Sequence, residues 1–453
     1  MSGTRERQSL TSGPIQGHLV RLTVPMIGGI LALISQSVVD TWFVSRLGTD
    51  ALSALSFTFP VIMAVSSIAI GLGAGAASVA ARTIGAGDTS RVRREATDSL
   101  VLSALIGLSV AFLGLATVET VFGRLGAQGT VLELVGAYMD VWYLGLAFVV
   151  VPMVGNGLIR AAGDARIPGL IMMSAALLNL IFDPLLIFGI GPFPELGLQG
   201  AAVATVIANL SACCLGLWAL QFRERMIVWA VPPLTETLDS WKRVLQVGVP
   251  AAGANMINPL GVAAITAMLA TFGKEAVAAF GVATRIEMLA GVAMFALSSS
   301  IGPVVGQNWG RGEFGRVTEA LRLTIRFNLA YGVGLAALLA LLGPFIARLF
   351  SDTEAVAGLA TVYLWIVPIT LAGYGINIVG AAALNAIGLP LIAVMLTFVR
   401  MALIYIPLAL LLGRWLGPPG VFAAGALANI VAGFVTVRVC RARLQPTQAV
   451  QPS

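Results

Sequence analysis

Two carboxylates interrupt otherwise apolar stretches of this sequence. Asp40 follows SQSVV, and Asp183 lies within LNLIFDPLL. A carboxylate at the centre of a membrane helix costs about 2.5–3.5 kcal/mol on insertion scales, so such groups are kept where they face a cavity and have a function. We therefore expect both aspartates to bind a proton or a small cation.

Polar side chains with suitable oxygens accompany these acids. Gln36 and Asn179 each precede an aspartate by four residues and so share its helix face. Carboxylate, amide and hydroxyl oxygens suit a shared proton or a hard cation such as Na⁺. A single amide or hydroxyl in a membrane helix is more often a helix–helix hydrogen bond, and this alternative stays open for Asn156 and Thr205. The predicted coupling site is Asp40, Asn156, Asn179, Asp183 and Thr205, and Na⁺ is possible at Asp40, Asn179, Asp183 and Thr205.

Prolines mark points where two of these helices can bend. Pro184 deprives the Leu180 carbonyl of its helical hydrogen bond, and Pro25 does the same for Arg21. The freed Leu180 carbonyl is either a further ligand or only the sign of a kink. We expect Pro25 and Pro184 to act as hinges.

The composition indicates which elements must hold these residues. Of 453 residues, 58% are hydrophobic and 11% charged, and the mean hydropathy is +0.93. A soluble domain of this length would carry about 25% charged residues. Apolar runs of about 20 residues, the length that spans a bilayer, recur along the chain. They do not alternate polar and apolar residues, so the sequence predicts an all-α membrane protein rather than a barrel.

We expect twelve transmembrane helices. An even number places both termini on one side, and basic residues concentrate there, as in the loop with Arg91, Arg93 and Arg94. The positive-inside rule then predicts that both termini are cytoplasmic. It also explains the net charge of +6 without a nucleic-acid partner. The expected helices are 16–46, 53–83, 94–122, 131–162, 167–190, 198–222, 239–272, 276–308, 314–345, 353–387, 389–413 and 419–440.

The sequence repeats itself at a nearly constant spacing. LGTDALSALSF at 47–57 matches FGKEAVAAFGV at 272–282, 225 residues later, and LGLQG at 196–200 matches LGPPG at 416–420, 220 residues later. Six helices per copy give both copies the same orientation, with a pseudo-two-fold axis along the membrane normal and a central cleft. The expected parts are an amino-terminal lobe (1–222), a cytoplasmic linker (223–238), a carboxy-terminal lobe (239–440) and a polar tail (441–453).

The second copy lacks the polar cluster of the first. Asp40 aligns with Ile265, and Asp183 with Ile406. A role in helix packing would have been kept in both copies, so the difference favours a specialised ion site in the first lobe. Asn179 and Thr205 follow the same pattern, since they align with Ala402 and Gly425.

Together these features resemble the multidrug and toxic compound extrusion (MATE) family from end to end. The resemblance rests on VVDTWFVSRLG at 38–48, GNGLIRAAGDARIP at 155–168, LNLIFDPLLIFG at 178–189 and VVGQNWGRG at 304–312. Asp40, Asn179, Asp183 and Thr205 match the first-lobe cation site of its prokaryotic DinF-like branch. The chain lacks the second-lobe acids of the NorM-like branch, offering Asn255 and Asn258 in the seventh helix instead.

The resemblance implies a non-enzymatic antiporter. It would export organic, cationic amphiphilic compounds by alternating access in exchange for H⁺ or Na⁺, without another cofactor. Phosphate-binding loops are absent from the sequence, which agrees with an ion gradient as the energy source. We expect a functional monomer surrounded by lipid. Candidate residues for the substrate cleft are Gln36, Tyr138, Trp142, Asn255, Met256, Met288, Met294 and Tyr374.

Other functions remain open at this point. A lipid-linked oligosaccharide flippase of the same superfamily would use basic residues such as Arg285, Arg326 and Arg400 to hold a pyrophosphate. An intramembrane aspartyl hydrolase would use Asp40 and Asp183, but GAGD at 85–88 is better explained as a helix end and a helix start. Glu287, two residues after Arg285, suits an ion pair or helix-end role as well as a functional one.

Overall fold

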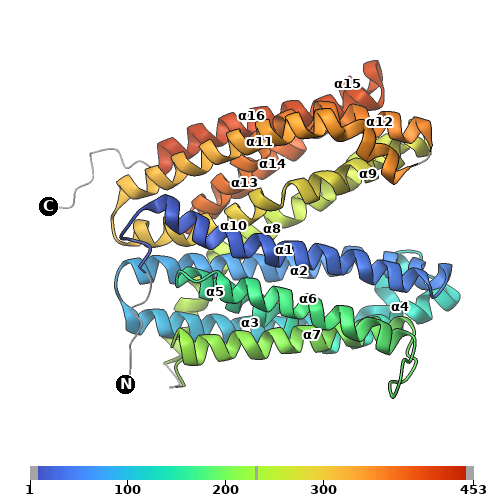
Figure 1. Ribbon diagram of the computed structural model, residues 1–453. Helices are drawn as coiled ribbons and strands as arrows, with labels where there is room; N and C mark the ends of the chain where they lie inside the picture. The colour runs from blue at the N-terminus through green and yellow to red at the C-terminus, as the bar shows by residue number, and fades with distance from the viewer. Residues whose placement is uncertain (1–8, 230–232, 352, 445–453) are drawn as a thin grey trace. The chain divides into compact units, whose positions relative to one another are not determined.

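The computed structural model describes residues 9–229, 233–351 and 353–444, and this part of the chain forms helices and no strand (Figure 1). The predicted linker and tail therefore lie partly outside the described residues, at 230–232 and 445–453. The α-helices are α1 (Ile15–Ser45), α2 (Thr49–Gly85), α3 (Thr89–Arg124), α4 (Gly129–Leu144), α5 (Ala147–Ala161), α6 (Arg166–Ile187), α7 (Leu198–Trp218), α8 (Leu234–Ala270), α9 (Lys274–Ala290), α10 (Val292–Gly310), α11 (Phe314–Phe350), α12 (Glu354–Ile366), α13 (Leu371–Ala386), α14 (Pro390–Phe398), α15 (Ile406–Leu416) and α16 (Pro418–Leu444).

The prediction of an all-α membrane protein is confirmed. Within the described ranges, ten helices or continuous helical segments are long and apolar enough to cross a membrane, and two bent pairs bring the number to twelve. The pair α4 and α5 bends by 47° after Leu144, and the pair α9 and α10 bends by 48° at Gly291. The expected helices 131–162 and 276–308 are therefore each broken, because a run of apolar residues predicts a span but not its bend.

Glycines at equivalent positions of the two copies have similar backbone conformations. Gly48 and Gly273 have φ of 105° and 115°, and Gly197 and Gly417 have φ of 56° and 65°. Only glycine adopts this region at little cost, so equivalent turns in the two copies require it. Two differences lie in the second copy: it has a break at Gly291 with no counterpart in α2, and a π-helix at Val399–Tyr405 separates α14 from α15.

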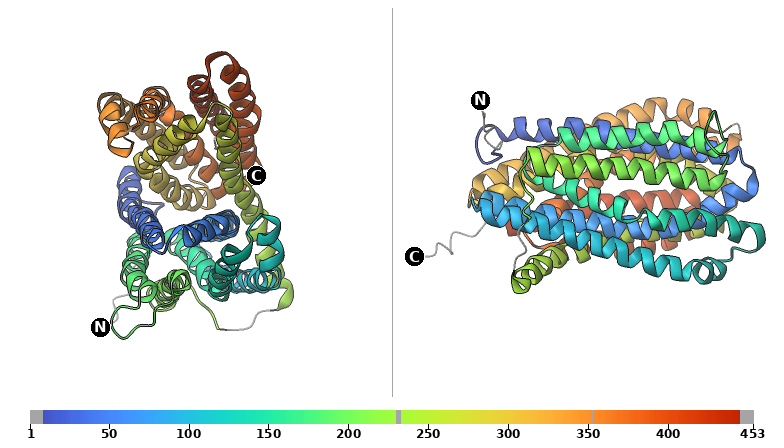
Figure 2. Two further views of the ribbon diagram at one scale, coloured as in Figure 1. Left: turned by 90° about the vertical axis from the view of Figure 1, so that its right-hand side faces the viewer. Right: turned by 90° about the horizontal axis from the view of Figure 1, so that it is seen from below.

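The chain divides into two compact units that do not follow the repeat boundary. Among the described residues, the first unit comprises Ser9, 24–229 and 233–252, and the second comprises 10–23, 253–351 and 353–444. Figure 2 shows the helices of the first unit, blue to green, running alongside one another. Each of α1 and α8 therefore changes unit part-way, close to Pro25 and Pro250 respectively.

Charged side chains hold the start of α8 within the first unit. Arg243 pairs with Glu95 of α3 at 3.2 Å, and the Trp241 indole donates to the Asp98 carbonyl at 2.9 Å. Arg94 also pairs with Glu236. Glu95 is 1% exposed, so this carboxylate depends on its partners, which include Arg91 at 3.0 Å. The network explains why residues 234–252 pack with the first copy.

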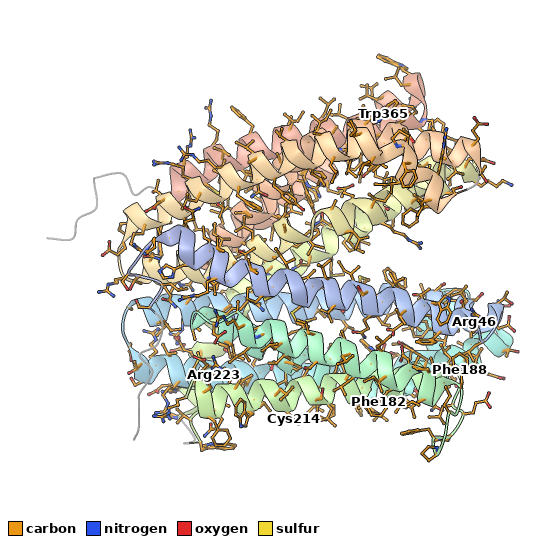
Figure 3. The ribbon with its side chains drawn as sticks, in the orientation of Figure 1. Arg46, Phe182, Phe188, Cys214, Arg223 and Trp365 are labelled. Carbon is orange, nitrogen blue, oxygen red and sulfur yellow. The ribbon has the colours of Figure 1, made fainter. Side chains whose placement is uncertain are left out.

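Arginines lie at both ends of the first unit, whereas exposed apolar side chains lie on its outer face. Figure 3 shows Arg46 and Phe188 at one end of this unit and Arg223 at the other. Phe112 and Leu113 of α3 are 73% and 61% exposed. Apolar side chains this exposed on a candidate membrane span are suited to lipid hydrocarbon.

Close backbone contacts at equivalent glycines generate a stability prediction. A Cβ at Gly200 would lie 2.4 Å from the Leu186 carbonyl oxygen, and one at Gly420 would lie 2.2 Å from that of Leu412. We expect Gly200→Ala and Gly420→Ala each to destabilise the protein by about 1–3 kcal/mol, because the helices must move apart. Thermal unfolding in detergent measures the change. Gly136→Ala, where a Cβ meets no atom within 4 Å, is the matched control, and equal melting temperatures for all three variants would refute the prediction.

Candidate functional site

The two membrane aspartates meet inside the first unit. Asp40 of α1 and Asp183 of α6 lie within hydrogen-bonding reach of each other, and Gln36 hydrogen-bonds to Asp40. The same two helices also pack closely about four turns away, where a Cβ at Gly169 of α6 would lie 2.7 Å from the Pro25 carbonyl oxygen of α1. Asp183 is fully buried. Two carboxylates this close repel each other, so one proton or a cation between them is needed to relieve the repulsion.

Asn179 links this pair to α7. Its Nδ2 donates to Asp183 Oδ1 at 3.4 Å and to Thr205 Oγ1 at 3.3 Å. Asn179 is itself fully buried, as expected for a residue one helical turn before Asp183. The structure thus brings together four of the five residues of the predicted coupling site: Asp40, Asn179, Asp183 and Thr205.

Several oxygens at this site have no hydrogen-bond partner. Asp40 Oδ1, Asp183 Oδ2 and Asn179 Oδ1 are all buried and unpaired. A buried acceptor without a donor is costly, and a bound proton or cation removes that cost. The donor set therefore fits H⁺ or Na⁺. Among the described residues no group of three or more His, Cys, Asp or Glu side chains could hold a metal, so Na⁺ would need the amide and hydroxyl oxygens as well.

Asn156 is placed differently. Its Oδ1 is also buried and unpaired, but it lies on α5, which packs mainly against α2, α3 and α7. Among the described side chains, Asn156 forms no hydrogen bond with either aspartate.

The expected cleft residues of the first unit lie in its core. Tyr138 of α4 is 6% exposed and is close enough to Asp40 and Asp183 to interact with both electrostatically. Trp142, one turn further along, is 4% exposed and packs edge-on against Tyr143 at a centroid distance of 5.5 Å. Tyr138 thus borders the acid pair, whereas Trp142 packs in the hydrophobic core.

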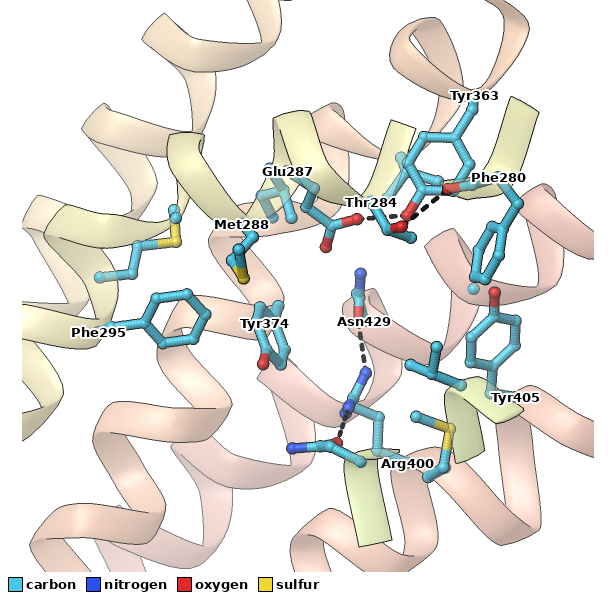
Figure 4. A pocket seen from close by; sticks show the side chains of 18 residues that line it. Phe280, Thr284, Glu287, Met288, Phe295, Tyr363, Tyr374, Arg400, Tyr405 and Asn429 are labelled. Carbon is cyan, nitrogen blue, oxygen red and sulfur yellow. Dashed lines mark hydrogen bonds between the residues drawn. The ribbon is translucent and has the colours of Figure 1, made fainter. Parts of the chain in front are cut away.

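The second unit contains a separate cavity of about 230 Å³. Figure 4 shows Glu287, Tyr374 and Arg400 among the side chains around it. Met288 and Met294 of the predicted cleft set also line it, whereas the seventh expected helix contributes Asn258 rather than Asn255 or Met256. A single water needs only about 10–15 Å³ of such volume, so the cavity has room for an organic group.

Arg400 is a buried cation in the wall of this cavity. It is 6% exposed and lies over the Tyr374 ring at 4.8 Å. Its Nη1 donates to Asn429 Oδ1 at 3.2 Å and its Nη2 to Asn258 Oδ1 at 2.6 Å, while its Nε has no partner. No carboxylate lies within 4.0 Å of it among the described residues. The positive charge is therefore held by neutral groups.

Glu287 lines the same cavity from α9. It accepts a hydrogen bond from the Tyr363 hydroxyl, and it interacts electrostatically with Arg400 without forming an ion pair. Its neighbour in sequence, Arg285, is exposed, so the ion pair considered for Glu287 does not form with that arginine.

Arg326 is exposed as well, and of the three arginines expected for a flippase only Arg400 reaches the cavity.

Sequence reasoning did not identify Tyr363, Tyr405 or Asn429 as parts of a site. One signal was available: Tyr363 follows Tyr138 by the repeat spacing of 225 residues, so each copy places a tyrosine beside its buried acid. Tyr405 had no such signal, because it lies on the π-helix of the second copy.

The GAGD segment is explained by helix ends, as predicted. Gly87 has φ of 84°, and Asp88 caps α3 by accepting from the Arg91 amide at 3.0 Å. This hydrogen bond, with that of the Ser90 hydroxyl, holds the pKa of Asp88 below its ordinary value. The acid therefore stabilises a helix start outside the membrane spans.

Comparisons with known proteins agree with this architecture. The chain matches the MatE family model at residues 25–185 and 250–411. It is 39% identical over 445 residues to the FAD transporter of Shewanella oneidensis, covering 98% of each chain. It is 24% identical over 436 residues to the multidrug export protein MepA of Staphylococcus aureus, covering 95% of each.

A solved structure shares the whole fold. The MATE transporter VcmN of Vibrio cholerae, in a variant form, superimposes with a TM-score of 0.90 at 28% identity, covering 94% of this chain and 98% of that one. The family match falls once on each copy of the repeat, and the relatives span almost the full length. The chain is a multi-pass transporter of the MATE family.

Proposed function

We propose that the protein exports organic, cationic amphiphilic compounds across the bacterial or archaeal inner membrane in exchange for H⁺ or Na⁺. The observation that carries this proposal is the buried contact between Asp40 and Asp183, with its unpaired oxygens. The basic residues concentrated in loops such as the one with Arg91, Arg93 and Arg94 support cytoplasmic termini. The protein acts as a monomer in lipid.

Ion binding provides the energy difference that transport needs. With both carboxylates ionised, the pair repels itself and attracts a cationic substrate. With a proton or Na⁺ bound, the repulsion and the attraction both fall. A ligand shifts a conformational equilibrium only by its difference in affinity between the two states, and this change supplies such a difference.

A second candidate substrate has its own support. The relative with 39% identity is named a FAD transporter, and FAD is a dinucleotide anion with a flat ring system. The buried charge of Arg400 in the second unit suits a compound rich in hydrogen-bond acceptors better than a cation. Export of a flavin compound by the same coupling is therefore the alternative within this function.

The hinge is assigned to Pro25. Residues 15–23 of α1 pack with the second unit and residues 24–45 with the first, so Pro25 lies at the changeover. The corresponding changeover in α8 lies beside Pro250. A helix that lacks one hydrogen bond bends more easily, so α1 can respond to ion binding at Asp40. Pro184 lies inside α6 directly after Asp183 and serves as a second bending point.

Neutralising either aspartate tests the coupling site. We expect Asp40→Asn and Asp183→Asn each to lower gradient-driven ethidium efflux from proteoliposomes by about tenfold or more, because ion binding no longer changes the charge of the pair. Asp140→Asn, at an exposed acid of α4, is the matched control. Wild-type efflux rates in both site variants would disprove the mechanism.

The coupling ion is decided by imposing pH and Na⁺ gradients separately. If Na⁺ is the ion, Thr205→Val removes one oxygen ligand and weakens Na⁺-driven efflux by about tenfold or more, whereas a proton needs only the carboxylates. We therefore expect efflux driven by a pH gradient to be unchanged in Thr205→Val, whichever ion normally drives transport. Loss of pH-driven efflux in a folded Thr205→Val protein would contradict this division of roles.

The hinge has a test of its own. Pro25→Ala restores a backbone donor to α1, so we expect slower efflux with unchanged ethidium binding in detergent. Pro60→Ala in α2 is the control proline inside a helix. If Pro25→Ala transports as the wild type does, the bending of α1 at this position is not required.

A further inference from the structure

The cavity of the second unit lies where the second copy departs from the first. The break between α9 and α10 falls at Gly291, one turn after Glu287, and the π-helix Val399–Tyr405 carries both Arg400 and Tyr405. All of these residues line the cavity. Extra residues in a helix turn are a frequent mark of a functional site, because they redirect side chains that a regular helix would place elsewhere.

The two copies have different residues at equivalent positions, and this difference leaves room for the cavity in the second copy. Thr205 of the coupling site corresponds to Gly425, where a Cβ would lie 2.9 Å from the Tyr405 ring. A side chain at position 425 would therefore displace Tyr405. The second copy has exchanged the ion-binding oxygens for a pocket with aromatic rings on the same frame.

The chemistry of the wall defines what it can hold. Tyr374 and Phe295 present aromatic surface, with ring centroids 6.3 Å apart, and the thioethers of Met288 and Met294 adapt to flat rings. The polar groups are a donor, the Arg400 guanidinium, whose Nη1 and Nη2 each have a second N–H beyond those given to Asn429 and Asn258, and an acceptor, the carboxylate of Glu287. Figure 4 shows these two groups entering the cavity from different helices.

We propose that this cavity binds the planar heteroaromatic part of an exported compound through a cyclic imide edge. In such an edge a ring N–H lies beside ring carbonyls, as in the isoalloxazine of flavins and in uracil. A carbonyl accepts from Arg400, the N–H donates to Glu287, and the ring lies among Tyr374, Phe295 and the thioethers. This assignment rests on the proposed export function and specifies which substrates the second unit selects.

An imide edge matches both charges without needing an ion on the ligand. A simple aromatic cation would satisfy Glu287 but would be repelled by Arg400. A carboxylate or phosphate would satisfy Arg400 and be repelled by Glu287. A neutral edge that carries both a donor and acceptors satisfies both groups, which are costly to leave unpaired in a buried pocket.

Riboflavin is a suitable probe, since its ring is fluorescent, neutral and quenched on stacking against tyrosine. We expect the purified full-length protein in nanodiscs to quench it in a saturable manner. Methylation of the imide nitrogen, in 3-methylriboflavin, should weaken binding by about tenfold to a hundredfold, because it removes the donor to a charged acceptor. Equal binding of the two compounds would overturn the proposal without any mutant.

Variants locate the site. Arg400→Gln and Glu287→Gln should each weaken riboflavin binding by about tenfold or more. Tyr374→Phe should preserve binding, and Tyr374→Leu should reduce it. Arg326→Gln, at an exposed arginine of α11, is the matched control for Arg400→Gln. If folded Arg400→Gln protein binds riboflavin as tightly as the control does, the cavity is not the site.

Ethidium efflux separates this proposal from the function on which it rests. Gradient-driven ethidium efflux that depends on Asp183, together with no riboflavin binding, would remove the imide site and leave the antiporter intact. Imide-selective riboflavin binding with efflux that ignores Asp183 would instead remove the coupling mechanism and leave the binding site in place.

Discussion

The contact between Asp40 and Asp183 is the constraint on which the first unit depends. Two acids, one from α1 and one from α6, are held together in a buried environment where both cannot remain charged without a compensating ion. Asn179 is fixed between Asp183 and Thr205, so the geometry of the pair extends to α7. Under the proposed function, binding of a proton or Na⁺ here would change the interactions of all three helices.

The second copy uses the same frame for a different purpose. Both copies keep the positive-φ glycines and the close glycine contacts that join neighbouring helices. The first copy places carboxylate, amide and hydroxyl oxygens in its core, whereas the second places Arg400, Glu287 and tyrosines around a cavity. The two copies thus share a backbone frame, and their side chains support the two separate roles that we propose, ion binding in the first and recognition of an organic group in the second.

The division into compact units gives α1 and α8 a special role. Each helix begins in one unit and ends in the other, and each has a proline close to the changeover. The charged network around Glu95 anchors the start of α8 to α3. Because each of these helices has residues in both units, a bend in it would change how the helix packs in both of them.

The sequence by itself determined the class of protein, the number of spans, the repeat and the residues proposed for the ion site, four of which the structure brings together. These follow from apolar run length, fixed spacing and the cost of a charge in lipid, all of which act locally along the chain. Tertiary structure alone decided that Asp40 meets Asp183, that Asn156 forms no hydrogen bond with either, and that α1 and α8 change unit. It also decided the bend at Gly291 and the π-helix at Val399–Tyr405, which assemble the cavity around Arg400. Such features depend on how distant helices pack, and the period of an apolar run carries no information about that packing.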